Sequence, residues 1–313
     1  MTIRKPLLCL ALLGTMALGM AATAAEAATR VYVSLSRSEV FINGIRDAIL
    51  REDAADDGIE VTLQQADGDS ATQIRQIDDA VKQKYDAIIV LTVDDASGLH
   101  ALKAAGAANI PLVFVNTPPP AEAQGRVSVV ACNDIVAGRL QMRLLSLAMK
   151  DQGNLAIIRG GDSSATTDRV QGIHEILAGQ PGIKVVGDFN AHWSRDEAEK
   201  QVESWIDQGV HIDAIAANSD EMALGAATAL HAKGVKAKVF IGGNDGTLNG
   251  LDGIASGDLY VTLRQDTAAM AHAALANART MAAGGYAQQY QWVPYELVLP
   301  TNLKSFTAPN AAP

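Results

Sequence analysis

Polar side chains that are suited to binding a small molecule follow the apolar runs of this sequence. Carboxylate and guanidinium groups make charge-assisted hydrogen bonds to hydroxyls, amides supply both a donor and an acceptor, and aromatic faces cover C–H surfaces. A site built from these groups fits a neutral ligand that carries many hydroxyls. The segments that contain them are 36–41, 116–120, 159–164 with 168–169, 190–193, 218–219, 243–246 and 264–266.

The elements that would position these segments alternate between strand and helix. Short apolar runs such as 30–35 and 155–158 are separated by amphipathic stretches of helical period such as 42–51 and 135–150. Continuous apolar strands between helices are typical of parallel strands that are covered on both faces. The sequence therefore predicts a doubly wound α/β fold, in which ligands bind beyond the carboxyl ends of the strands.

Two parallel sheets are expected, because so many strands would make one unusually large open sheet. The length of the chain also suits two domains of ordinary size. The division is predicted near Cys132, where one series of strands and helices ends and a second series begins.

The first 27 residues have the pattern of a cleavable export signal. Arg4 and Lys5 precede an apolar run at 7–20, which is too short to span a membrane, and 25–27 is an A-x-A cleavage site. Cleavage would leave 23 basic and 34 acidic side chains, a net charge of −11. An acidic chain is not expected to bind nucleic acid or an anionic membrane surface. We therefore expect an exported protein, which the resemblance given below would place in the periplasm.

The sequence lacks the usual motifs of enzymes and cofactor-binding proteins. It has no G-x-S-x-G or H-E-x-x-H motif, and the segment 242–246 is neither a P-loop nor a dinucleotide-binding fingerprint. Only Cys132 would remain after signal cleavage, so no intramolecular disulfide is expected, and we interpret this cysteine as a buried small residue. The sequence favours a binding protein without cofactor or metal over an enzyme.

Three of the polar or aromatic side chains in these segments also have a simple structural interpretation. Trp193 would pack on its own domain at a helix start. Arg169 would form a surface ion pair with Asp168 or Glu175. Asp245 would form an ordinary Asp-Gly turn.

The stretch 216–226 has two interpretations of the same kind. A short strand runs into Asn218 and Ser219 and then directly into a helix, and both residues are competent helix caps. Asp220 and Glu221 put negative charge at the positive end of that helix. Beside the other strand ends, the stretch becomes one wall of a cleft, and we expect Asn218 and Ser219 to face the ligand.

The run at 218–226, the segment 243–247, the signal and the two α/β units together resemble the type I periplasmic sugar-binding proteins. The chain resembles the ribose-binding and galactose/glucose-binding members in particular, and the resemblance covers the mature chain. It implies a multi-strand hinge, a ligand trapped between lobes, and delivery to an ABC permease by a monomer. An alternative is a sensor that presents its closed form to a chemoreceptor or sensor kinase. The lobes would be 28–132 with 266–296 and 133–265 with 297–306, followed by a tail at 307–313.

The resemblance also assigns roles to individual residues. Phe41 and Trp193 match the two aromatics that sandwich a sugar ring, and Arg169 and Asp245 match charged residues of the second lobe. The loop at 150–154 is too short for the calcium site of the galactose/glucose branch. The predicted ligand-binding residues are Glu39, Phe41, Asn116, Thr117, Arg169, Trp193, Asn218, Ser219, Asp245 and Gln265.

Some positions depart from the family pattern. Ser219 stands where relatives usually have Asn, and Thr117 stands where they have Arg or Lys. Ser163 and Ala165 replace two residues that read hydroxyls in the glucose binder. Fewer charged groups are therefore expected in this cleft, and the sequence indicates a small sugar, polyol or related compound without selecting one.

Overall fold

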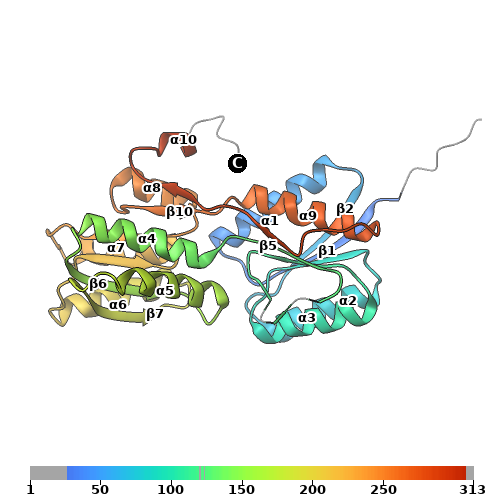
Figure 1. Ribbon diagram of the computed structural model, residues 1–313, viewed down its shortest axis with the longest axis horizontal. Coiled ribbons are helices and arrows are strands. Elements are labelled where there is room, and N and C mark those ends of the chain that lie inside the picture. Colours follow the sequence, from blue (N-terminus) through green and yellow to red (C-terminus); the bar gives the residue numbers. More distant parts are fainter. Residues whose placement is uncertain (1–26, 120, 123, 308–313) are drawn as a thin grey trace, which may run out of the picture.

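The computed structural model describes residues 27–119, 121–122 and 124–307. All but the last residue of the predicted signal segment 1–27 lies outside these residues, as does 308–313 of the predicted tail. Two parallel sheets with helices on both faces confirm the predicted α/β class (Figure 1). Within the described part of the chain, no helix is long and apolar enough to cross a bilayer.

The first lobe is built on a six-stranded parallel sheet in the order β11-β5-β4-β3-β1-β2. Helices α1 and α9 pack together on one face of this sheet, and α2 and α3 cover the other (Figure 1). The strands are β1 (Thr29–Leu35), β2 (Ile59–Gln65), β3 (Ala87–Val90), β4 (Leu112–Val115), β5 (Val127–Ala131) and β11 (Tyr290–Trp292). The helices are α1 (Val40–Ala55), α2 (Ser70–Lys82), α3 (Asp95–Ala108) and α9 (Thr267–Ala282).

The second lobe is built on a four-stranded parallel sheet in the order β7-β6-β8-β9. Helices α4 and α5 pack together on one side, and α6 and α7 pack together on the other. The strands are β6 (Gly153–Arg159), β7 (Ile183–Asn190), β8 (Ala214–Ala217) and β9 (Phe240–Gly242). The helices are α4 (Asp134–Ala148), α5 (Ser164–Leu177), α6 (Arg195–Asp207), α7 (Asp220–Ala232) and α8 (Leu248–Ser256).

The chain passes between the two lobes three times. The first crossing joins β5 to α4, the second joins β10 (Thr262–Arg264) to α9, and the third joins β11 to β12 (Glu296–Val298). Strands β10 and β12 form an antiparallel pair beside β9, and the short helix α10 (Lys304–Thr307) follows. We propose that these three segments, which we call the first, second and third crossings, are the hinge expected from the sequence.

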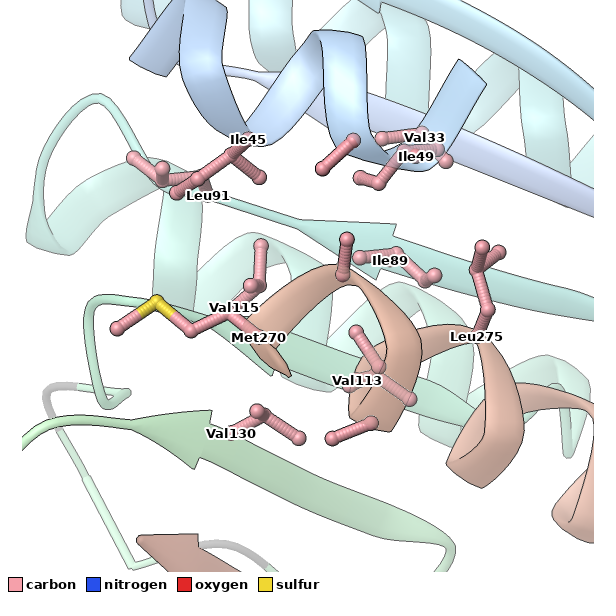
Figure 2. Packing of buried hydrophobic residues seen from close by; sticks show 14 of the residues in the cluster. Val33, Ile45, Ile49, Ile89, Leu91, Val113, Val115, Val130, Met270 and Leu275 are labelled. Carbon is pink, nitrogen blue, oxygen red and sulfur yellow. The ribbon is translucent and has the colours of Figure 1, made fainter. Parts of the chain in front are cut away.

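Apolar side chains fill the space between the helices and the sheets. Figure 2 shows part of the core between α1, α9 and the first sheet, including Ile45, Ile49, Met270 and Val113, none of which is exposed. Cys132, on the first crossing, belongs to the same core, and burial raises the pKa of its thiol. The interpretation of this cysteine as a buried small residue is confirmed.

Candidate ligand-binding site

A cavity of about 250 Å³ lies where the carboxyl ends of the strands of both lobes meet. Its wall comes from the loops after β1, β3 and β4 on one side, and from the loops after β6, β7 and β9 on the other. Its volume is close to the lower end of the roughly 300–1,000 Å³ that is usual for small-molecule sites. The structure brings eight of the ten predicted residues into this wall: Glu39, Phe41, Asn116, Thr117, Arg169, Trp193, Asp245 and Gln265. That a ligand contacts them remains a prediction.

Arg169, on α5, is the centre of the polar network in the cavity wall. Its side chain is buried, and its Nε lies 2.7 Å from Asp134 Oδ1. One terminal nitrogen donates to the Tyr295 hydroxyl at 3.0 Å, and the other donates to the backbone carbonyl of Asn218 and lies 3.6 Å from Asp245 Oδ1. Burial alone would lower the pKa of this guanidinium, but Asp134, Tyr295 and Asp245 outweigh burial and raise it well above its ordinary value.

The interpretation of Arg169 as a surface ion pair with Asp168 or Glu175 is wrong. The guanidinium points into the protein and pairs with buried Asp134, while Glu175 pairs with Arg139 on the surface. Arg169 lies on the same face of α5 as Ala165, Gly172 and Ile173, and this face is buried against α4.

Two glycines make that close approach possible. A Cβ atom on Gly138 of α4 would overlap the backbone carbonyl of Arg169, and one on Gly172 of α5 would overlap the carbonyl of Ile135. Glycines without Cβ atoms therefore let α4 and α5 touch through their backbones. This contact brings Asp134, the first residue of α4, beside the Arg169 guanidinium.

A chain of side-chain hydrogen bonds connects the two lobes along the cavity. Asn116 of the first lobe donates to Gln265 Oε1 at 2.9 Å, and Gln265 Nε2 donates to Asp245 Oδ1 at 3.1 Å. Asp245 in turn lies beside Arg169. Burial raises the pKa of Asp245 well above its ordinary value, and the positive charge of Arg169 opposes that rise. Asp245 is thus more than a surface Asp-Gly turn, because its carboxylate is buried in the network.

Four residues of the cavity wall have left-handed backbone conformations. Asn116, His192, Trp193 and Asp245 all line the cavity, and their φ angles are 65°, 48°, 63° and 107°. Non-glycine residues in this left-handed region cost roughly 1–3 kcal/mol each, and they persist only where the surrounding structure holds them. Such strain is characteristic of ligand sites whose geometry is fixed in advance.

Trp193 packs on its own lobe and also lines the cavity, so both interpretations of this residue describe part of its position. Its indole ring lies against the backbone of Gly160 and Gly161, where a Cβ atom on Gly160 would overlap the ring. The guanidinium carbons of Arg37 and Arg169 each lie 5.8 Å from its ring centroid. Since Arg37 belongs to the first lobe, Trp193 is contacted from both sides of the cavity.

Asn218 and Ser219 do not line the cavity, contrary to the prediction. Ser219 is the N-cap of α7, and its hydroxyl accepts a hydrogen bond from Met222 N at 3.3 Å. Asn218 Oδ1 accepts from Gly160 N at 3.2 Å. Both side chains are buried behind the wall. The Asn218 amide bonds to the Gly160 backbone, against which the Trp193 ring packs. The helix-cap interpretation of Ser219 holds.

Asp220 begins α7, as expected, and its carboxylate also bonds to two other segments of the second lobe. It accepts hydrogen bonds from Thr262 Oγ1 at 2.6 Å and from Thr247 N at 2.9 Å. Burial raises the pKa of Asp220 to about 7, against the opposing effect of these hydrogen bonds. Asp220 therefore ties the start of α7 to β10 and to the segment after β9.

The cavity wall also contains polar residues that are not among the ten predicted ligand-binding residues. Ser36 is fully buried there, and its Oγ has no hydrogen-bond partner among the described residues. Burial raises the pKa of Glu39, an effect that Arg37 at 3.9 Å opposes. Position after a strand end was the available signal for most of these residues. These further polar residues are Ser36, Arg37, Thr92, Asp162, Ser163 and His192.

Metal binding has no support in the part of the chain that the structure describes. No group of three or more His, Cys, Asp or Glu side chains there is arranged to hold an ion.

Comparison with known proteins agrees with this geometry. The model of the periplasmic binding protein domain matches residues 31–285. A putative rhizopine-binding protein of Rhizobium meliloti is 34% identical over 260 residues, which cover 81% of this chain and 84% of that protein. A xylitol-binding protein of Mycolicibacterium smegmatis is 34% identical over 275 residues, which cover 87% of this chain and 78% of that protein.

A solved structure extends the comparison to three dimensions. An ABC transporter solute-binding protein from Bacillus halodurans with bound myo-inositol is 32% identical to this chain. It superposes with a TM-score of 0.86 and covers 90% of this chain and 99% of its own. The chain therefore belongs to the periplasmic binding protein family, as its resemblance to the type I sugar-binding members predicts.

Proposed function

We propose that this protein is the solute-binding component of an ABC importer and that it captures a sugar, cyclitol or linear polyol between its lobes in the periplasm. The observation that carries the proposal is the interlobe cavity, in which Arg169, Asp245, Gln265 and Asn116 form one network beside Trp193. One relative that binds xylitol and one with bound myo-inositol support the ligand class.

The chemistry of the wall fits a compound with many hydroxyls. Glu39 and Asp245 accept hydrogen bonds from hydroxyls, Arg169 donates to them, and amides such as Asn116 do both. Ser36 Oγ is buried without a partner, and an unmet buried polar group favours a ligand that supplies one. The face of Trp193 is suited to the C–H face of a ring. These features favour a cyclic polyol or a pyranose over a charged or flat ligand.

Capture would proceed by closure of the two lobes. A ligand held by the second lobe would meet Glu39, Phe41 and Asn116 of the first lobe, and it would bind the closed form more tightly than the open form. The closed protein would then be recognised by the permease. We propose binding without catalysis, as the relatives are transport components. The protein would be monomeric and exported by its N-terminal signal.

A thermal-shift screen tests the proposal directly. The mature protein would be melted with cyclitols, pentoses, hexoses and linear polyols, and with nucleosides and amino acids for comparison. A ligand at 100 times its Kd should stabilise the folded state by about 2.7 kcal/mol. Stabilisation by amino acids or nucleosides alone, or by none of the compounds, would contradict the proposal.

Substitution of Gly160 by alanine should weaken the best ligand of that screen at least tenfold, which is about 1.4 kcal/mol. The new Cβ atom would overlap the Trp193 ring, so the indole must leave its place in the wall. Titration calorimetry would measure the Kd, and tryptophan fluorescence would report the movement of the ring.

Gly106→Ala is the matched control, since no atom lies within 4 Å of a Cβ at that helical position. It should leave the Kd unchanged and stabilise the protein by about 0.5–1 kcal/mol. Equal affinities for the Gly160→Ala variant and the wild type would show that Trp193 does not contact the ligand.

A further inference from the structure

The hydroxyl of Tyr295 joins the Arg169 network from outside the cavity. It donates to Asp134 Oδ1 at 2.6 Å and accepts from Arg169 at 3.0 Å. Asp134 Oδ1 also accepts from Arg169 Nε, so the three side chains form a closed triangle. Tyr295 is absent from the cavity wall, whereas Arg169 is part of it.

Two corners of this triangle lie beside or on different crossings between the lobes. Asp134 immediately follows the first crossing, and Tyr295 lies on the third, between β11 and β12. The second crossing carries Gln265, which reaches Arg169 through Asp245. A single guanidinium in the cavity wall is therefore bonded to two crossings and connected to the third through one side chain.

Burial keeps the Tyr295 hydroxyl protonated. Burial raises the pKa of the Tyr295 hydroxyl well above its ordinary value, against the opposing charge of Arg169. The phenol thus remains a donor to Asp134 throughout the physiological range. Arg169 and Asp134 are only 2% and 4% exposed, so water competes little for these bonds.

We propose that Tyr295 is a positioning residue that couples ligand binding to hinge closure through Arg169 and Asp134. Its hydroxyl fixes the orientation of the guanidinium toward the cavity and ties the first crossing to the third. A ligand that bonds to Arg169 therefore favours one arrangement of the two crossings, although it never touches Tyr295. This role rests on the proposed function for its ligand, but the effect on the hinge is measurable without one.

Tyr295→Phe removes the hydroxyl and keeps the ring. In small-angle X-ray scattering, the ligand-free variant should have a larger radius of gyration than the wild type, because the crossings are no longer tied. Its Kd for the compound that shifts the melting temperature most in the screen should rise about tenfold, which is about 1.4 kcal/mol.

Tyr32→Phe is the matched control, because Tyr32 is also largely buried and its hydroxyl bonds to Gln64 within the first sheet. It should change neither the radius of gyration nor the Kd. A purely structural role for Tyr295 would lower the melting temperature and leave both of these quantities at the wild-type value. That result would overturn the proposal.

A double-mutant cycle with Arg169→Lys tests the route of the coupling. If Tyr295 acts through Arg169, then Tyr295→Phe should change the Kd less than twofold in the lysine background. Full additivity of the two changes would overturn the proposed route. If no compound in the screen binds, the proposed function fails, while the scattering of the ligand-free variants still decides whether Tyr295 controls the hinge.

Discussion

Replacement of Arg169 by methionine should abolish ligand binding and lower the free energy of unfolding by about 3–5 kcal/mol. The substitution removes the positive charge from the cavity wall. It also leaves the carboxylates of Asp134 and Asp245 buried without the cation that both now face. Chemical denaturation would measure the stability, and the thermal-shift assay would measure binding.

The loss of stability should depend on pH in a defined direction. Burial raises the pKa of Asp245, and Arg169 opposes that rise, so its removal raises the pKa further. In both proteins the folded state binds this proton more tightly than the unfolded chain does, so stability falls as the pH rises, and in the variant it falls over a wider pH range. The deficit of the variant relative to the wild type should therefore grow as the pH rises through the raised pKa of Asp245.

Arg139→Met provides the control for this prediction. Arg139 pairs with Glu175 on the exposed side of the same helix pair, and surface ion pairs of this kind contribute about 0–1 kcal/mol. Similar losses of stability in the two variants would mean that the ion pairs of Arg169 contribute no more to stability than a surface ion pair does.

Replacement of Trp193 by alanine should weaken ligand binding about 100-fold, which is about 2.7 kcal/mol. The indole offers the cavity a broad apolar face, and a ligand ring packed against it would lose both burial and aromatic contact. The ligand-free protein should remain folded, because the ring is only partly buried at the edge of the second core. Calorimetric titration and circular dichroism would measure the two effects.

Trp292→Ala is a suitable comparison, because this tryptophan is 50% exposed on the edge strand β11, outside the cavity wall. It should bind ligand with the affinity of the wild type. If the Trp193 variant does so as well, the aromatic wall is not part of the binding site.

The sequence alone determined the α/β class and where the binding site would lie. Alternating apolar strands and amphipathic helices are compatible with few other folds. The carboxyl ends of parallel strands all lie at one edge of each sheet. Residues that follow strand ends, such as Asn116, Trp193 and Asp245, therefore met in one cavity although they are far apart in the chain. Glu39 and Gln265 also lie in such segments, and the family resemblance assigned them a ligand-binding role.

The sequence did not determine which of the residues after a strand point into the cavity. At Asn218 and Ser219, the same residue types serve as ligand contacts or as helix caps, and both uses place them after a strand. In the structure, Ser219 accepts a hydrogen bond from a backbone N–H group in the first turn of α7, and Asn218 accepts one from Gly160 N. The choice depends on how α7 packs against its neighbours, which no local pattern records.

Only the tertiary structure revealed the centre of the site. Arg169 is 35 residues from Asp134 and 126 residues from Tyr295. Each partner comes three residues after a strand end, at β5 and β11, but that position alone does not indicate that either one meets Arg169. The glycine contact between α4 and α5 brings the first partner in, and the third crossing of the chain brings the second. Such pairings depend on packing between distant segments. The positions of polar residues in the sequence therefore predicted most of the cavity wall, and only the tertiary structure revealed the contacts of Asp134 and Tyr295 that position Arg169 in that wall.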